Sequence, residues 1–179
     1  FTIDVTTTND RPSASGGSAQ VTEGNGNTVR LTSGSVGMSD ADGSLDGKTG
    51  EGVADFLWFK VTGFAVDGSS TAHGVVERWT GSAWVTVTTT EWLPSTILSA
   101  SADSGTSGLR YRHDGSEPLA YTGGAKVSFT YVVRDDLGNP GNAFATNTTT
   151  PSDTSGSAQS NQSTTGTTTI NIVPVNNAP

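Results

Sequence analysis

The sequence predicts an all-β fold, and three observations lead to that class. Ser, Thr, Gly, Asn and Asp dominate the composition, while the residues that favour helices are sparse. The apolar residues fall in short β-branched and aromatic runs, which Gly and Asn turns separate. The chain has 179 residues and no Cys, so it is long enough to bury a core without disulfides. We therefore expect a β-sandwich of short strands.

Eight runs have strand character, and turn residues lie between them. The run 126–134 has the clearest period of two, because every second side chain from Val127 to Val133 is large and apolar. We expect this run to be a central strand with that face in the core. The eight expected strands cover residues 20–22, 28–32, 56–64, 74–79, 83–88, 108–112, 126–134 and 167–173.

Four tryptophans stand out in this Ser- and Thr-rich chain. A Thr-Gly-Ser turn between Trp79 and Trp84 predicts a hairpin that brings these two indoles together. Trp58 lies in an apolar Phe-Leu-Trp-Phe run, which favours a place in the core. A sugar-binding module would instead display two or three indoles on one face. A carbohydrate or peptide ligand therefore stays open as an alternative role, and an exposed coplanar pair of rings would favour it.

Acidic residues outnumber basic ones, and the formal net charge is -8. The average surface field therefore repels nucleic acid and anionic membranes, and cations are the expected partners. No apolar run approaches the roughly 20 residues that a membrane span needs, and no signal-peptide pattern opens the chain. We expect a soluble segment without membrane insertion, whose export signal lies outside it.

The two ends of the chain resemble one another. Residues 2–12 align without a gap on residues 169–179, with identities at the initial Thr-Ile, the Asn and the closing Pro. A repeat at a fixed period is typical of an array whose units contact their neighbours. We expect residues 1–12 to be the end of a preceding repeat with its linker, residues 13–175 to be one sandwich repeat, and residues 176–179 to start the next linker.

Acidic residues lie mainly in the predicted loops, where calcium sites form. Calcium takes about six to eight oxygen ligands and tolerates irregular cages built from loops. Asp40 and Asp42 make an Asp-x-Asp turn, and Asp135 and Asp136 directly follow the run 126–134. A single Asp in a turn also serves local hydrogen bonding, so none of them identifies a site alone. The other acids of this pattern are Glu23, Asp114 and Glu117.

Several motifs together resemble a known family. They are Val-Thr-Glu-Gly-Asn at 21–25, Ser-Asp-Ala-Asp-Gly at 39–43, Leu-Arg-Tyr-Arg-His-Asp-Gly-Ser-Glu at 109–117, Phe-Thr-Tyr-Val-Val-Arg-Asp-Asp at 129–136 and Val-Asn-Asn-Ala-Pro at 175–179. The set is similar to the cadherin-like repeats of the chondroitin-sulfate-proteoglycan type, which occur in tandem in giant bacterial adhesins, including the type I-secreted repeats-in-toxin class. The resemblance covers nearly the whole chain. It implies a Greek-key, cadherin- or immunoglobulin-like sandwich of about seven to nine strands, with calcium where consecutive units meet.

The resemblance also implies which residues hold calcium at each joint. At the amino-terminal joint the implied ligands are Asn9, Asp10, Asp40, Asp42 and either Asp135 or Asp136. At the carboxy-terminal joint they are Glu23, Asp114, Glu117, Asn176 and Asn177. The sequence departs from the family in two ways, because position 177 is Asn where the family has Asp and the unit is longer than usual. We therefore expect the carboxy-terminal site to be weaker or to need the next unit.

The expected role is structural. Many such repeats would project a distal binding domain from a bacterial cell surface after type I secretion, for adhesion or biofilm formation, and calcium would stiffen the joints. The expected partners are neighbouring repeats and Ca²⁺, and the isolated repeat is expected to be a monomer. Self-association through an exposed edge strand is a further alternative. We expect no enzyme, because His113 beside Asp114 has no nucleophile motif or second nearby His, and we expect His113 to order its loop.

Overall fold

The computed structural model describes residues 12–39, 57–65, 73–98, 108–116, 125–134 and 163–175. All eight predicted strands are present in these ranges, with ends shifted by up to a few residues, and the all-β sandwich is confirmed. They are β2 (Gly17–Thr22), β3 (Thr28–Leu31), β5 (Trp58–Ala65), β6 (Gly74–Trp79), β7 (Trp84–Thr86), β9 (Leu109–His113), β10 (Ala125–Arg134) and β11 (Gly166–Val173).

Three short strands and one helical turn were not predicted. They are β1 (Ser13–Ala14), β4 (Met38–Ser39), β8 (Trp92–Pro94) and the 3-10 turn η1 (Ser95–Leu98). Strands of two or three residues carry no readable alternation, and the proline that ends β8 is tolerated because β8 is an edge strand. Within the described ranges, no helix has the length and apolar character needed to cross a membrane.

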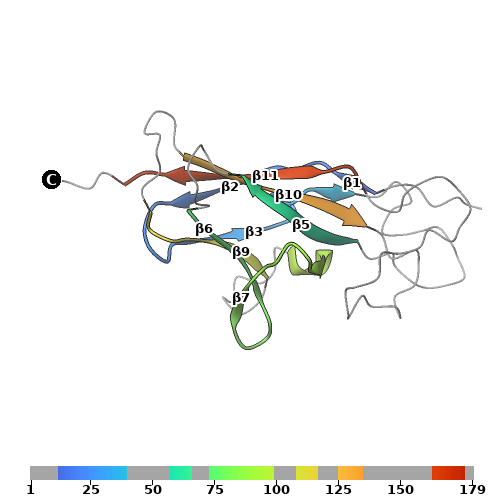
Figure 1. Ribbon diagram of the computed structural model, residues 1–179, viewed down its shortest axis with the longest axis horizontal. Coiled ribbons are helices and arrows are strands. Elements are labelled where there is room, and N and C mark those ends of the chain that lie inside the picture. The colour runs from blue at the N-terminus through green and yellow to red at the C-terminus, as the bar shows by residue number, and fades with distance from the viewer. Residues whose placement is uncertain are drawn as a thin grey trace, which may run out of the picture.

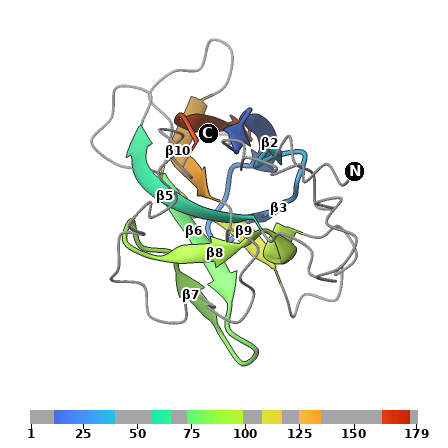
Figure 2. The same cartoon turned by 90° about the vertical axis from the view of Figure 1, so that its right-hand side faces the viewer.

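The strands form two large sheets and one small one (Figures 1 and 2). The five-stranded sheet has the order β2-β11-β10-β5-β8, and the four-stranded sheet has the order β3-β9-β6-β7. The small sheet pairs β1 with β4. Among the described pairs only β2 and β11 run parallel, and the others are antiparallel.

The inward side chains of the two large sheets form one hydrophobic core. β10 is the middle strand of its sheet, as predicted, and its buried face includes Val127, Phe129 and Val133, each at most 1% exposed. Trp58 differs from its prediction, because the neighbouring Phe59 points into the core and the period of two turns Trp58 to the outer face, where it is half-buried.

Tyr131 fastens the small sheet to the core. Its hydroxyl donates to the Gly37 carbonyl at 2.7 Å and accepts the Gly16 N–H at 3.0 Å. Burial raises the pKa of Tyr131 above its ordinary value, and these two bonds only partly oppose it. The phenol is therefore protonated at neutral pH and satisfies both loops that flank β1 and β4.

The described chain starts and finishes at opposite ends of the long axis. Figure 1 shows β1 at one end, while β11 points toward the other. We call the end with β1 and β4 the amino-terminal end, and the end where β2 and β11 finish the carboxy-terminal end. The linker boundaries predicted at 1–12 and 176–179 lie almost entirely outside the described residues and stay predictions.

Candidate functional site

Two of the predicted calcium ligands, Glu23 and Asp114, fall among the described residues. The calcium prediction can therefore be examined directly only around these two side chains. The other predicted ligands lie outside the described ranges and stay predictions: Asn9, Asp10, Asp40, Asp42, Glu117, Asp135, Asp136, Asn176 and Asn177.

Glu23 ties the end of β2 to the end of the last strand. Its backbone N–H donates to the Val173 carbonyl at 2.8 Å, and its Oε2 accepts the Val175 N–H at 3.0 Å. The residue is only 6% exposed. Because a carboxylate rarely lies buried without a donor, the bond from Val175 accounts for its position. Glu23 thus contacts Val175, the last described residue of the chain, and its role as a calcium ligand stays a prediction.

His113 joins the loop after β2 to the loop after β9. Its Nδ1 accepts the Gly115 N–H at 2.9 Å and, more weakly, the Gly24 N–H at 3.4 Å. Two donors at Nδ1 require a neutral ring with its proton on Nε2, and this buried nitrogen has no partner in the described part of the chain. His113 itself is fully buried. As predicted, it orders its loop, and it holds Glu23 and Asp114 at one end of the sandwich.

Asp114 closes a tight turn. Its Oδ1 accepts both the Ser116 backbone N–H, at 2.8 Å, and the Ser116 hydroxyl, at 2.5 Å. Partial burial pushes the pKa of Asp114 upward, but the two hydrogen bonds from Ser116 outweigh it and hold the pKa below its usual value. The carboxylate is therefore ionised at neutral pH, and its Oδ2 makes no hydrogen bond within the described residues.

His73 completes this end of the molecule. It is 2% exposed, has a φ of 49°, and its Nδ1 lies 2.7 Å from the Ser116 Oγ. Because the Ser116 hydroxyl gives its proton to Asp114, Nδ1 of His73 is the donor in this contact. The Ser116 hydroxyl lies between the two other side chains. It donates its hydrogen bond to Asp114 and accepts one from the His73 imidazole. The chain of bonds fixes the loop geometry.

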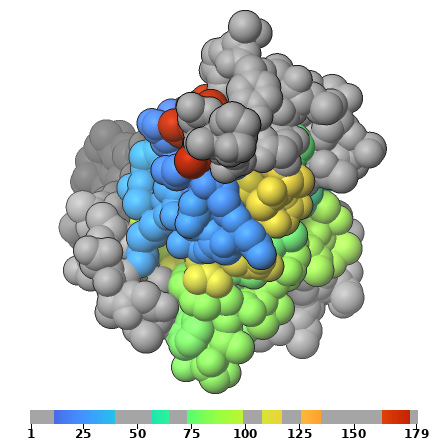
Figure 3. All heavy atoms as spheres, turned by 90° about the vertical axis from the view of Figure 1, so that its left-hand side faces the viewer, coloured from blue at the N-terminus to red at the C-terminus, as the bar shows by residue number. Residues whose placement is uncertain are grey.

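The carboxylates at the carboxy-terminal end are of the type that binds calcium. Figure 3 looks onto this end, where the blue amino-terminal segments and the yellow residues around β9 adjoin below the red atoms of β11. Glu23 and Asp114 offer hard carboxylate oxygens, but no three acidic or histidine side chains among the described residues gather as a metal site. A complete cage would have to draw on further residues.

Two strands that directly precede predicted ligands of the amino-terminal joint finish at the amino-terminal end. β4 ends at Ser39, directly before Asp40, and Ser39 pairs with Ser13 of β1. β10 ends at Arg134, directly before Asp135, and its arrow in Figure 1 points to the end with β1. The two described strands that precede Asp40 and Asp135 thus finish at the end where the described chain begins.

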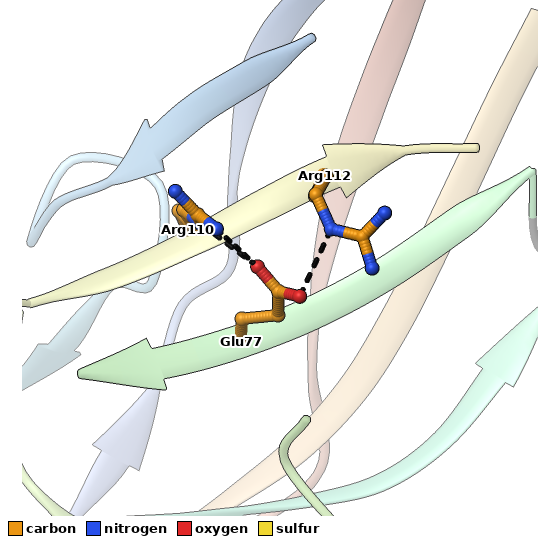
Figure 4. Close-up of polar contacts among 3 residues, drawn as sticks. All are labelled: Glu77, Arg110 and Arg112. Carbon is orange, nitrogen blue, oxygen red and sulfur yellow. Dashed lines mark hydrogen bonds and ion pairs between the residues drawn. The ribbon is translucent and has the colours of Figure 1, made fainter. Parts of the chain in front are cut away.

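A second charged cluster lies on the outer face of the four-stranded sheet (Figure 4). Glu77 of β6 sits between two arginines of β9: its Oε2 accepts from Arg110 Nε at 2.8 Å and Nη2 at 2.7 Å, and its Oε1 accepts from Arg112 Nε at 2.9 Å. The Arg110 guanidinium also lies 4.0 Å from the Trp84 ring centre. Sequence reasoning missed this cluster, although the Arg-Tyr-Arg alternation in 110–112 was a signal that both guanidiniums share one face.

The tryptophan hairpin forms as predicted, but not as a flat platform. Trp79 and Trp84 are register partners with ring centres 5.5 Å apart, and their planes are tilted by 58°. Arg110 covers one face of Trp84. The coplanar pair that would favour ordinary sugar stacking is therefore absent from this hairpin.

Replacing Glu77 by Gln is expected to remove an acid-sensitive part of the stability. Burial raises the pKa of Glu77, but the hydrogen bonds and charges of Arg112 and Arg110 outweigh it and hold the pKa below the ordinary value of 4.5. Since the folded pKa is depressed, this stability is present above the unfolded pKa and is lost as the pH falls through the folded one. Urea unfolding at about pH 7 and about pH 3 should show the gap between wild type and Glu77→Gln narrowing at low pH. A gap of equal size at both pH values would contradict the ion-pair account.

No family model, no curated protein and no solved structure matches the chain.

Proposed function

We propose that this chain is a structural extender repeat of a bacterial surface adhesin, with calcium stiffening the joints between repeats. The observation that carries the proposal is that the first and last described strands, β1 and β11, lead to opposite ends of the long axis (Figure 1). Units of this kind lengthen an array when joined in series, because each adds its full length to the stalk. The chain has no enzymatic role in this proposal, and it acts outside the cell after type I secretion.

The two ends of the sandwich also support calcium at the joints. At the carboxy-terminal end, the buried Glu23 carboxylate accepts the Val175 N–H, and ionised Asp114 lies on the loop that His113 links to Gly24, the neighbour of Glu23. At the amino-terminal end, β4 and β10 finish directly before Asp40 and Asp135. An ion bound only by the folded arrangement stabilises it by mass action, so calcium outside the cell would stiffen a joint that is loose inside it.

Thermal unfolding in calcium and in chelator tests this proposal. At a calcium concentration about 100 times the dissociation constant, the linkage is worth about 2.7 kcal/mol, or a rise of roughly 5–10 °C in Tm for a chain of this size. Asp40→Asn should lose most of that rise. The matched control is Glu91→Gln, because Glu91 forms an ion pair with Arg78 and is not a predicted ligand. Coincident melts in calcium and chelator would overturn the calcium part of the proposal.

A tandem of two copies tests the extender part separately. Small-angle scattering should give a larger and better-defined maximum dimension in calcium than in chelator, because the bound ion restricts the joint. A maximum dimension that calcium leaves unchanged would show that the joint is not stiffened, even if each unit binds the ion.

A further inference from the structure

The outer face of the four-stranded sheet carries a local positive charge in an acidic protein. By strand register, Arg30 of β3 lies opposite Arg110 of β9, which lies opposite Glu77 of β6, so these three side chains share one face with Arg112. Among the described residues of the cluster in Figure 4, the two arginines Arg110 and Arg112 share one carboxylate, that of Glu77, which leaves a positive charge here, whereas the whole chain has a net charge of -8. We call this surface the arginine face.

The Arg112 guanidinium has hydrogen-bond donors on this face that Glu77 does not use. Glu77 uses only its Nε, and Figure 4 shows the other two guanidinium nitrogens turned away from the carboxylate. Its side chain is 36% exposed, compared with 24% for Arg110 and 7% for Glu77. The Arg112 guanidinium makes no other hydrogen bond among the described residues. Its outer edge therefore presents two parallel N–H groups to solvent, which is the geometry that grips a carboxylate.

Aromatic surface continues from the arginines along the same face. Trp79 and Trp84 lie on the outer side of β6 and β7, and Arg110 bridges them to Glu77 through its contact with Trp84. From the Val75 position, opposite Arg112, to Trp79 is four residues of strand, or roughly 13 Å. The guanidiniums of Arg112 and Arg110 and the indole of Trp79 follow one another along this face. This arrangement suits a polymer in which charged groups alternate with apolar ring faces.

We propose that the arginine face binds an acidic polysaccharide whose sugars carry carboxylates, with Arg112 as the carboxylate-binding residue and Trp79 as the contact for a sugar ring. Carboxylate is favoured over sulfate because the same arginines already hold a planar carboxylate, that of Glu77: Arg110 contacts it through Nε and Nη2, and Arg112 through Nε. The net charge of the chain does not prevent this, since charges beyond about 8 Å are largely screened at physiological ionic strength. The inference is independent of the extender role and of calcium.

Binding of polygalacturonate oligomers, measured by titration calorimetry in chelator, tests the proposal. Arg112→Gln is expected to weaken binding by about tenfold or more, because it removes a charge-assisted contact. Lys126→Gln is the matched control, since it removes the same charge from an exposed position on the other large sheet and should leave binding unchanged. Neutral dextran should not bind.

A second variant keeps the test independent of any folding defect. Thr28 is exposed and is the register partner of Arg112, so Thr28→Glu places an internal carboxylate beside the guanidinium. It should abolish polygalacturonate binding without loss of stability, whereas Thr167→Glu, at an exposed position of β11, should not.

Four results would overturn the proposal. If polygalacturonate did not bind, the proposal would be wrong. If Arg112→Gln and Lys126→Gln weakened binding equally, only the net charge of the chain would matter. Dextran sulfate bound in preference to polygalacturonate would contradict the choice of carboxylate. Concentration-dependent dimerisation that Thr28→Glu abolishes would mean that the arginine face binds acidic groups of a second copy of this chain.

Discussion

Replacing His113 by Ala is expected to lower the free energy of unfolding by about 3–5 kcal/mol. The side chain is fully buried, so its loss leaves a cavity at the carboxy-terminal end. It also leaves the backbone N–H groups of Gly24 and Gly115 without their acceptor. Both effects destabilise the loops that hold Glu23 and Asp114. Urea unfolding at neutral pH measures the change.

Two further substitutions of His113 separate the acceptor from the packing. Asn places its side-chain oxygen near the position of Nδ1, so His113→Asn should keep the loop bonds while losing ring volume. His113→Phe keeps the ring volume and loses the acceptor. We expect both variants to lie between wild type and His113→Ala. A His113→Phe protein as stable as wild type would show that the imidazole holds the loops through packing alone.

Gly74→Ala is expected to destabilise the fold by about 3–5 kcal/mol. Gly74 has a φ of 153°, which strains any residue with a side chain, and an added Cβ would lie 2.2 Å from the Arg112 carbonyl oxygen and 2.7 Å from the Tyr111 hydroxyl. The carbonyl belongs to the backbone of β9, so neither strand can move without breaking the pairing of β6 with β9. Thermal unfolding of the variant measures the loss.

Gly81→Ala is the matched control for this prediction. Gly81 also has a positive φ, of 97°, but an added Cβ there would have no heavy atom within 4 Å. Its cost should be the conformational one alone, about 1 kcal/mol. If the two variants lost the same stability, the close contact at Gly74 would contribute nothing.

Alternation within a strand was readable from the sequence, and pairing between distant strands was not. The period of two in 126–134 predicted the buried face of β10, and the central position expected for this run is also found. The Arg-Tyr-Arg alternation in 110–112 carries the same kind of signal, although it was not used to predict a cluster. Glu77, the partner of both arginines, lies 33 residues from Arg110, and only the pairing of β6 with β9 brings them together.

The candidate calcium residues show the same limit. The position of Glu23 beside Val175 depends on pairing the first long strand with the last, which no local sequence pattern predicts. His113 was predicted to order its loop, but its contact with Gly24 needs the β3 and β9 register that brings the two loops together. Trp58 was predicted to lie in the core because its run is apolar. It is half-buried on the outer face instead, because every second residue of a strand points to the other side of the sheet.

The parallel pairing of β2 with β11 also decides how the molecule responds to tension. A force that pulls the two chain ends apart draws β2 toward the amino-terminal end and β11 toward the carboxy-terminal end, so it acts along the strands. The backbone bonds across the six paired positions from Gly17–Thr168 to Thr22–Val173 are then sheared together, whereas an unzipping load would break them one at a time. The bond from Val175 to Glu23 adds one more link beyond the last pair. A stalk built from such units would resist extension at the seam between its first and last long strands.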